Sequence, residues 1–366
     1  MHKLKIISVV GTRPNFIKVA PLCRAFGKYS DSIEHLLCHT GQHSDAMMSD
    51  VFFKDLGMPQ PDFYLDINNG THGEITGRII IAFEKILMQE KPDMVLVVGD
   101  VNSTMACALA AVKLGIKVAH VESGLRSNDR AMPEEINRLV TDAIADYLFV
   151  TEKSGIENLQ REGVASNKVF MTGNVMIDSL VYLQDKIAAS DIHQRLSLTR
   201  NQYILVTFHR PSNVDTIENL MSLIDFLNDL SEKLPVVFPI HPRTLRNINA
   251  FGLYDKIKTG VKLIEPVGYL DFQSLTRFAT IVVTDSGGIQ EETTYLGVQC
   301  ITVRNNTERP VTVDIGTNQL CGTDLDYVTQ KVNKILQGNI KKGAIPELWD
   351  GKAAERIAEI IYRKLK

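Results

Sequence analysis

Short apolar runs recur along the chain, each followed by a polar or glycine-containing turn and then by a segment with helical spacing. In the first half these runs cover residues 4–10, 35–39, 94–98, 117–121, 147–150 and 168–171. Between them, residues 16–26, 76–89 and 103–114 place apolar side chains three and four positions apart. Such runs predict buried strands, and the spacing predicts amphipathic helices. The alternation is typical of βα units on a parallel sheet.

The same alternation restarts after a polar, irregular stretch that includes residues 188–202. Further strands are expected at residues 203–207, 236–239, 261–264, 281–284 and 300–303. The final segment, residues 353–365, has apolar residues at helical spacing and predicts a terminal amphipathic helix. We therefore expect an α/β fold of two doubly wound domains joined near residues 173–200.

Composition and charge exclude several classes of protein. The 366 residues exceed the roughly 100 to 200 typical of one domain, in agreement with two. With 44% hydrophobic and 23% charged residues, the chain is neither disordered nor collagen-like. A net charge of -3 provides no basic field for a polyanion, so nucleic acid is not an expected partner. No apolar stretch reaches the ~18 residues of a membrane helix, so we expect no membrane partner.

The cysteines and the N-terminus indicate a cytoplasmic protein. The 5 cysteines are widely spaced and contain no Cys-x-x-Cys pair, which fits neither a disulfide scaffold nor a zinc knuckle. The first apolar run leads into Gly11 without a cleavage site and is interpreted as a strand rather than a signal peptide. Histidines, cysteines and carboxylates show no metal-ligand spacing, so a reaction without a metal is expected.

Polar residues follow most of the expected strands directly. In open α/β sheets, ligands bind outside the carboxyl ends of the strands. The polar segments at these positions are residues 11–15, 99–102, 122–126, 209–211, 241–243 and 285–288. If each domain carries one such edge and the two edges face each other, they enclose a cleft.

The most specific of these segments is Asp285-Ser286-Gly287-Gly288, which precedes a predicted helix. Backbone N–H groups at a helix N-terminus bind phosphate oxygens when no side chain obstructs them, so a diphosphate would fit here. An ordinary strand-to-helix turn with Ser286 as the N-cap explains the same residues. Neither a dinucleotide-binding nor a P-loop fingerprint occurs in the chain.

Three carboxylates are candidates for proton transfer. Asp100 and Glu122 end apolar strands, where a carboxylate loses hydration unless it has a partner. Either could instead cap a helix or pair with Arg126 or Arg138. Glu134 lies in the first turn of a predicted helix, where acidic residues are favoured without any catalytic role. Convergence of all three on one cleft would indicate acid–base chemistry.

Two histidines, His209 and His241, lie at strand ends beside arginines. Each is either a functional group or a hydrogen-bonded structural residue. His120 lies within an apolar run and is interpreted as a core residue.

These motifs occur in one order over nearly the whole chain. They comprise residues 11–14 with Lys18, and residues 40–43, 99–100, 120–126, 133–138, 172–174, 209–210, 285–288 and 307–310. The ordered set resembles the non-hydrolysing UDP-N-acetylglucosamine 2-epimerase family. The resemblance implies a GT-B-like fold, usually a homodimer, with two Rossmann-like domains facing across a cleft. It gives residues 1–173 and 174–350 as the domains and residues 351–366 as a helix packing back on the first.

The resemblance also implies a reaction that needs no nicotinamide cofactor. UDP-N-acetylglucosamine and UDP-N-acetylmannosamine would interconvert, supplying a precursor for cell-surface polysaccharide. The proton at C2 is not next to a carbonyl, but UDP is a good leaving group at C1. Elimination of UDP would give a 2-acetamidoglucal, to which UDP adds back after protonation of the other face. Such chemistry needs several proton-transferring groups and a cleft that closes.

Carried over by position, the family's catalytic residues are Asp100, Glu122 and Glu134, with His209 near the phosphates. The acid and base roles among the three carboxylates stay open. The substrate-binding residues are Arg13, Lys18 and Arg138 on the reacting side, and Phe272, Ser286, Gly287, Gly288, Glu292 and Arg309 on the nucleotide.

Some bacterial members bind a second UDP-N-acetylglucosamine as an activator, which makes Gln42, Arg210 and His241 possible allosteric residues. Asp45 and Asn69 stand where that site has Gln and Arg, so activation stays open. Ser212 replaces a glutamate found in many members between the His-Arg pair and Asn213.

Three other functions fit parts of the pattern. Residues 42–50 and 70–73 look like the subgroup that acts on UDP-2,3-diacetamido-2,3-dideoxyglucuronic acid. A GT-B glycosyltransferase would share the two-domain cleft, although it needs fewer acids. A catalytically silent nucleotide-sugar sensor would not require the carboxylates.

Overall fold

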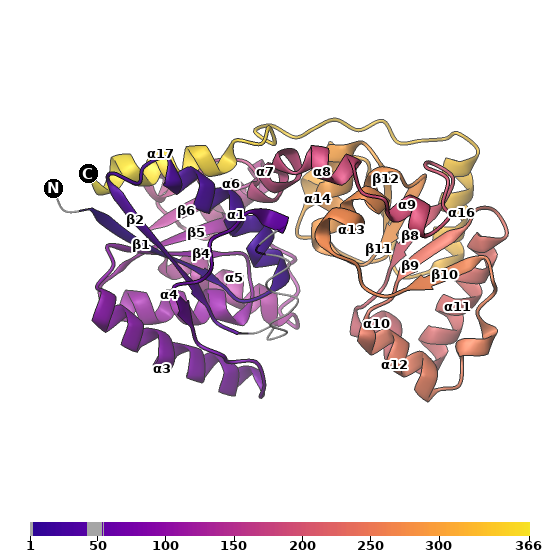
Figure 1. The fold of residues 1–366 in the computed structure, drawn as a ribbon, viewed down its shortest axis with the longest axis horizontal. Helices are drawn as coiled ribbons and strands as arrows, with labels where there is room; N and C mark the ends of the chain where they lie inside the picture. Colours follow the sequence, from indigo (N-terminus) through magenta and orange to yellow (C-terminus); the bar gives the residue numbers. More distant parts are fainter. Residues whose placement is uncertain (1–2, 42–52, 54) are drawn as a thin grey trace. The chain divides into compact units, whose positions relative to one another are not determined.

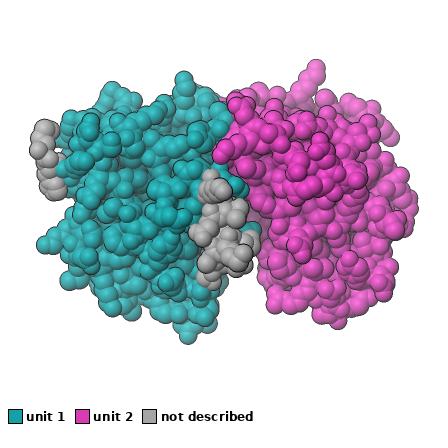
Figure 2. Space-filling view, viewed as in Figure 1, with its two compact units in different colours: residues 1–182, 347–366 teal, residues 183–346 magenta. Residues whose placement is uncertain are grey.

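The computed structural model describes residues 3–41, 53 and 55–366, and Figure 1 shows the chain as a ribbon. It divides into two compact units, coloured separately in Figure 2. Unit 1 comprises Met1–Tyr182 and Glu347–Lys366, and unit 2 comprises Leu183–Pro346. Each unit is built around one parallel sheet, so the fold class is the α/β architecture expected from the sequence.

Unit 1 contains a seven-stranded sheet in the order β3-β2-β1-β4-β5-β6-β7. The strands are β1 (Leu4–Val10), β2 (Ile33–His39), β3 (Phe63–Tyr64), β4 (Met94–Val98), β5 (Lys117–Ser123), β6 (Tyr147–Val150) and β7 (Val169–Met171). The helices are α1 (Arg13–Gly27), α3 (His72–Glu90), α4 (Asn102–Lys113), α5 (Pro133–Ile144), α6 (Lys153–Arg161), α7 (Val175–Tyr182) and α17 (Ala353–Leu365), with a 3-10 turn at Ser166–Lys168. All five residues of β4 are buried, as expected for a central parallel strand.

Unit 2 repeats this topology in a six-stranded sheet with the order β10-β9-β8-β11-β12-β13. Its strands are β8 (Ile204–Thr207), β9 (Val236–Pro239), β10 (Val261–Ile264), β11 (Ile281–Thr284), β12 (Gln299–Thr302) and β13 (Asn318–Leu320). Its helices are α8 (Gln184–Ala188), α9 (Ile192–Arg195), α10 (Pro211–Val214), α11 (Ile217–Ser231), α12 (Pro242–Ala250), α13 (Tyr269–Arg277), α14 (Gly287–Leu296), α15 (Pro310–Asp314) and α16 (Leu325–Leu336), with a 3-10 turn at Tyr254–Lys256.

The strand order reverses once in each sheet, between β1 and β4 in unit 1 and between β8 and β11 in unit 2. At such a switch point the connections leave in opposite directions and open a crevice at the carboxyl ends of the strands. The residues that follow β1, β4, β8 and β11 are therefore placed where a ligand would bind.

The expected domain limits need correction. Unit 1 continues to Tyr182 rather than ending at residue 173, because α7 packs on α1 and the Ser179 hydroxyl donates to the carbonyl of Ile17 at 2.5 Å. Residues 347–350 also belong to unit 1, where the buried Trp349 donates to the carbonyl of Thr151 at 3.0 Å.

Helix α17 packs on α1 within unit 1, and Figure 1 shows the two helices side by side. Its first two amides, at Ala353 and Ala354, donate to the buried carboxylate of Asp178 at 3.1 and 2.7 Å. Among the helices of the described residues, none combines the length and apolar character needed to cross a bilayer.

Candidate active site

Asn15, in the first turn of α1, connects two turns at the carboxyl edge of the unit 1 sheet, the edge formed by the carboxyl ends of its strands. Its side-chain oxygen accepts from the amides of Gly11 and Thr12 at 3.3 and 3.1 Å. Its side-chain nitrogen donates to the carbonyl of Val98 at 2.9 Å. The turns that follow β1 and β4 are thus tied together across the switch point.

Glu122 lies at this edge in a strained backbone conformation. Its φ of 71° is left-handed, and the pairing of β5 with β6 shifts register between Val121 and Ser123. A residue other than glycine in this region costs free energy, and such positions cluster at functional sites. The bulge allows a carboxylate to occupy the end of a buried strand.

Lys18 faces Glu122 from α1, with its Nζ 2.6 Å from Glu122 Oε2. Glu122 is only 2% exposed and Lys18 only 5%. Gly99 makes room for the lysine, because a Cβ there would lie 3.3 Å from Lys18 Nζ. A buried charge needs such a partner, so removal of either one leaves the other uncompensated.

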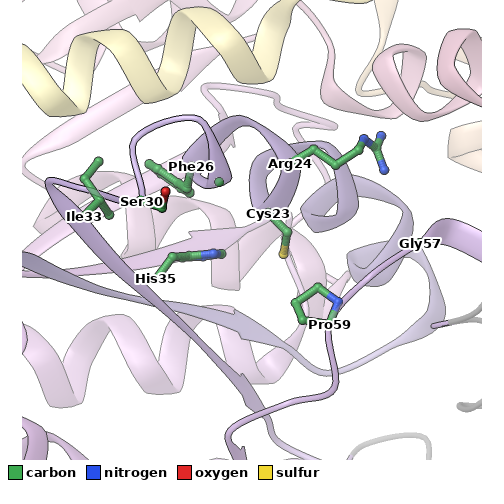
Figure 3. A pocket seen from close by; sticks show the side chains of 9 residues that line it. Cys23, Arg24, Phe26, Ser30, Ile33, His35, Gly57 and Pro59 are labelled. Atoms are coloured by element: carbon green, nitrogen blue, oxygen red, sulfur yellow. The ribbon is translucent and has the colours of Figure 1, made fainter.

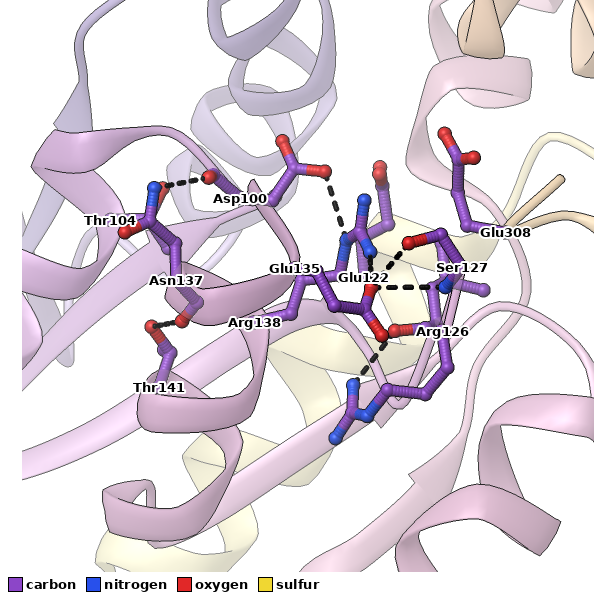
Figure 4. A network of polar contacts seen from close by, with 12 residues as sticks. Asp100, Thr104, Glu122, Arg126, Ser127, Glu135, Asn137, Arg138, Thr141 and Glu308 are labelled. Carbon is purple, nitrogen blue, oxygen red and sulfur yellow. Dashed lines mark hydrogen bonds and ion pairs between the residues drawn. The ribbon is translucent and has the colours of Figure 1, made fainter. Parts of the chain in front are cut away.

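Asp100, after β4, contacts a second buried cation. Arg138 on α5 places its Nε 3.0 Å from Asp100 Oδ2, and it also contacts Glu135. Figure 4 shows Arg138 between the two carboxylates. The side chain of Asp100 is 22% exposed whereas that of Arg138 is 2% exposed. Asp100 is therefore oriented by a fixed guanidinium and stays accessible to a ligand.

Glu135, which is not among the site residues expected from the sequence, fixes the position of Arg138. Its carboxylate accepts from the amide and hydroxyl of Ser127, both at 2.9 Å, and from the amide of Asn128 at 3.1 Å. Glu135 and Arg138 are three residues apart on one helix face, a spacing from which their ion pair could have been predicted. The adjacent Glu134 is exposed, and within the described residues its carboxylate has no hydrogen bond or ion pair.

His120 is buried, as expected, but it is also part of a polar cluster. Its Nδ1 lies 2.6 Å from Asp142 Oδ1, and its Nε2 lies 2.8 Å from the carbonyl of Gly99. Burial raises the pKa of Asp142, but His120 and Arg126 lower it by more, so it lies below its ordinary value.

Unit 2 has a different carboxylate at the corresponding edge. Asp285, after β11, is fully buried and accepts from the amides of His209 and Arg210 at 3.0 and 2.9 Å and from Asn213 Nδ2 at 3.0 Å. It also contacts His209 Nδ1 at 2.9 Å. Burial raises the pKa of Asp285, but the contacts with His209, Arg210 and Asn213 hold it below its ordinary value.

His209 is oriented by this contact, and its side chain remains 46% exposed. Arg210 donates from Nε to the carbonyl of Asp285 at 3.0 Å. His241 has a structural contact at the start of α12, where its Nδ1 accepts from the amide of Arg243 at 3.2 Å. Its ring centroid lies 6.3 Å from that of His209. Gln42 lies outside the described residues.

The turn between β11 and α14 leads into the helix through Ser286 and two glycines. Ser286 is the N-cap residue, but its side chain makes no capping hydrogen bond, so the ordinary side-chain cap is absent here. Its amide donates to Thr284 Oγ1 at 2.9 Å. At Gly287, a Cβ would lie 2.7 Å from Glu308 Oε1 and 2.8 Å from Arg309 Nη1. Glycine is therefore required for the close approach of these two side chains.

Arg309 belongs to a buried charge network beside this turn. Its Nε lies 2.9 Å from Glu291 Oε2, and its Nη1 contacts Glu308. Glu308 also accepts from Arg304 at 2.8 Å. No pattern in the sequence indicated Glu291 and Glu308 as partners of Arg309.

Glu292 and Phe272 lie on the two neighbouring helices, α14 and α13. Glu292 is buried. Burial of the Tyr269 hydroxyl raises its pKa well above the ordinary value, and the nearby charge of Glu292 raises it further. Phe272 is partly buried and packs against the apolar cluster below β8 and β11.

A pocket of about 280 Å³ lies elsewhere in unit 1 (Figure 3). It is lined by Cys23, Arg24, Phe26, Gly27, Ser30, Ile33, His35, Gly57 and Pro59. Burial raises the pKa of Cys23 to about 12 and lowers that of His35 to about 4, which makes both groups neutral. Ile33 begins β2, so this pocket lies at the opposite end of that strand from the carboxyl edge. Within the described residues, no group of three or more His, Cys, Asp or Glu is arranged to hold a metal.

Comparison with known proteins gives a consistent result. A family described as UDP-N-acetylglucosamine 2-epimerase matches residues 27–362. A Methanocaldococcus jannaschii protein named UDP-N-acetylglucosamine 2-epimerase is 44% identical over 98% of this chain and 99% of its own. A Pseudomonas aeruginosa protein named UDP-2,3-diacetamido-2,3-dideoxy-D-glucuronate 2-epimerase is 41% identical over 98% of this chain and 100% of its own.

Among solved structures, the fold matches a Methanocaldococcus jannaschii UDP-GlcNAc 2-epimerase in complex with UDP-GlcNAc and UDP. The TM-score is 0.90 at 42% identity, with 98% of this chain and 100% of that chain covered.

Proposed function

This chain belongs to the UDP-N-acetylglucosamine 2-epimerase family, and on that premise we propose that it interconverts UDP-N-acetylglucosamine and UDP-N-acetylmannosamine. The observation that carries the proposal is the pair of carboxylates at the carboxyl edge of unit 1, each held against a buried cation. Lys18 lies 2.6 Å from Glu122, and Arg138 lies 3.0 Å from Asp100. The related structure that binds UDP-GlcNAc and UDP supports the substrate.

In the proposed reaction, the C1–oxygen bond breaks, UDP leaves, and a base removes the proton from C2. The product of this elimination is a 2-acetamidoglucal. A proton is then delivered to the other face of C2, and UDP adds back to C1. Asp100 and Glu122 exchange these protons, with Glu134 as the third acid of the set. Because proton removal and delivery occur on opposite faces, one carboxylate alone does not suffice.

Lys18, Arg13 and Arg138 surround the reacting sugar in this proposal. Lys18 and Arg138 fix the two carboxylates, so the proton-transferring groups need little reorganisation during the reaction. Arg13, at the start of α1, is partly exposed at the same edge and reaches the substrate directly.

Unit 2 binds the nucleotide. The amides of Gly287 and Gly288, with the side chain of Ser286, hold the diphosphate at the N-terminus of α14, where the helix dipole favours negative charge. Arg309 completes the phosphate site, Glu292 binds the ribose and Phe272 lies near the base. His209, oriented by Asp285, stabilises the charge that grows on the leaving UDP.

Three further points complete the proposal. The enzyme works as a homodimer in the cytoplasm, a location supported by its 5 free cysteines. The diacetamido-glucuronate substrate is not favoured, although one relative at 41% identity carries that name. We do not propose activation by a second substrate molecule through Gln42, Arg210 and His241, because Arg210 and His241 have structural contacts of their own.

The test is an NMR time course of the purified protein in D2O with UDP-N-acetylglucosamine, and with UDP-2,3-diacetamido-2,3-dideoxyglucuronic acid in parallel. We expect a manno-configured UDP-sugar with deuterium at C2, formed faster from UDP-N-acetylglucosamine. Faster conversion of the glucuronate would replace the substrate and keep the reaction. Binding of UDP without deuterium exchange in either sample would contradict the proposal and favour a glycosyltransferase or a sensor.

A further inference from the structure

His120 has more polar contacts than a core residue needs. It is fully buried in β5, and each of its ring nitrogens has a partner, Asp142 Oδ1 at 2.6 Å and the Gly99 carbonyl at 2.8 Å. A buried polar group without partners is costly, so both contacts stabilise the ring in one orientation.

The partners determine the protonation of the ring. The Gly99 carbonyl can only accept, so Nε2 carries a hydrogen. Asp142 Oδ2 accepts from the amide of Gly124 at 3.0 Å and lies 2.7 Å from the guanidinium of Arg126. Arginine stays protonated in proteins, so Asp142 beside it is a carboxylate and accepts from Nδ1 as well. Both ring nitrogens therefore donate, and His120 is an imidazolium.

The next member of the cluster holds Arg126 in place. Arg126 donates to both oxygens of Glu162, the residue that follows α6, at 2.7 and 2.6 Å. With a protonated His120, the charges from His120 through Asp142 and Arg126 to Glu162 alternate in sign, so each charge lies beside an opposite one.

The cluster fixes the backbone next to both candidate catalytic carboxylates. Gly99, whose carbonyl accepts from His120, immediately precedes Asp100, and its amide donates to the carbonyl of Val121 at 3.0 Å. Gly124, whose amide donates to Asp142, comes two residues after Glu122. One histidine–aspartate pair thus connects the turn that carries Asp100 with the turn that follows Glu122.

We propose that His120 is a positioning residue, held as an imidazolium, that sets the placement of Asp100 relative to Glu122. It does not touch the substrate. The inference rests on the proposed function, because it assumes that these two carboxylates exchange protons with the sugar.

A matched pair of variants tests the contact with Gly99. The amide nitrogen of His120→Gln occupies roughly the place of Nε2 and can still donate to the Gly99 carbonyl. The amide nitrogen of His120→Asn corresponds to Nδ1, so it can donate to Asp142 but not to Gly99. Both variants lose the positive charge. We expect kcat to fall about 100-fold in His120→Asn with little change in KM, and less than about 10-fold in His120→Gln. Equal Tm values would show that the difference is not one of folding.

The second test is ¹⁵N NMR of the full chain labelled at histidine. We expect one histidine that carries a proton on each ring nitrogen under the conditions of the activity assay, as its two hydrogen-bond acceptors require. In Asp142→Asn, the amide can donate to Nδ1, so this ring should become neutral while it still donates to Gly99.

A neutral His120 ring in the wild type would overturn the inference. Equal kcat values for the two His120 variants at equal Tm would overturn it as well. An inactive wild type contradicts the proposed function, whereas an active wild type with equivalent variants contradicts only the role of His120.

Discussion

The carboxyl edges of the two sheets have the same topology but different chemistry. In unit 1, Glu122 and Asp100 lie against Lys18 and Arg138, and Asp100 is accessible. In unit 2, Asp285 is fully buried and accepts from backbone amides, and the neighbouring turn into α14 presents its own amides without a side-chain cap. In our proposal, the residues that follow the strands give the same topology acid–base groups at one edge and an anion-binding turn at the other.

The largest expected effect is on turnover at the edge of unit 1. Glu122→Gln should lower kcat by about 10²- to 10⁴-fold, the usual contribution of a proton-transferring group. The same change leaves Lys18 buried without its partner, which should cost about 3 kcal/mol of stability. The double variant Lys18→Met/Glu122→Gln should recover Tm without recovering turnover. UDP affinity, measured by calorimetry, should change little in either variant. Recovery of turnover with Tm would show that Glu122 has only a structural role.

The next effect is on the stability of unit 2. The depressed pKa of Asp285 means that its carboxylate stabilises the fold above the ordinary aspartate pKa of about 4 and loses this contribution as the pH falls toward the native pKa. Asp285→Asn should therefore cost about 2 kcal/mol at pH 7. Urea unfolding at several pH values should show this difference shrinking as the pH falls below about 4. A constant difference would contradict the assigned protonation.

A smaller effect is expected at the anion-binding turn. Gly287→Ala adds a Cβ that would lie 2.7 Å from Glu308 Oε1 and 2.8 Å from Arg309 Nη1, so either the turn or these two side chains must shift. We expect UDP affinity to fall about 10-fold, since about 1.4 kcal/mol of binding free energy is lost when groups that hold a ligand move away from it. Gly77→Ala on α3 makes the same change in open space and serves as the control. Equal affinities in calorimetry would argue against diphosphate binding at Gly287.

The smallest effect is expected on the pH dependence of stability at Asp178. Like Asp285, this aspartate is buried and accepts from backbone amides. Burial raises the pKa of Asp178 to about 6, although the amides of Ala354 and Ala353 oppose the shift. Its native pKa thus exceeds the unfolded value, so its contribution to stability falls as the pH rises from about 4 to 6.

In Asp178→Asn, the side chain keeps one oxygen that can accept from the amides of α17, but it no longer titrates. The stability of the variant should therefore lack this pH dependence. The stability of the variant relative to the wild type should therefore rise by about 1 kcal/mol between about pH 5 and about pH 6. An opposite slope in urea unfolding would contradict the assigned shift.

Much of the fold could be predicted from the sequence, because buried parallel strands leave apolar runs that end at turn residues. The limits of β1, β4, β6, β9, β10 and β11 agree with the expected ranges. Strands β3 and β13 were missed, since they contain two and three residues at the sheet edges and bear no such pattern. The boundary at residue 173 was wrong because α7 looks like the start of a new unit locally but packs on α1.

The candidate site was only partly predictable, because partners distant in sequence leave no local signal. Asp100 and Glu122 stood out as polar residues at the ends of apolar strands. Arg138 was named as a possible partner, and it does pair with Asp100. The pairing of Lys18 with Glu122 was not expected, since these two residues meet only through the fold. His120 looked apolar in context, and its pairing with Asp142 across 22 residues was invisible. The structure leaves Glu134 exposed at the start of α5, so its role stays a prediction.

The most direct test of the central claim is a positional isotope exchange experiment with UDP-N-acetylglucosamine that carries ¹⁸O between C1 and the β-phosphorus. If UDP departs and returns, the label must scramble between the bridging and non-bridging oxygens while UDP-N-acetylmannosamine forms, and ³¹P NMR resolves the two positions. The elimination and return of UDP require scrambling in the wild type, and we expect its loss in Lys18→Met/Glu122→Gln. Epimerisation with all of the label retained in the bridge would contradict this mechanism.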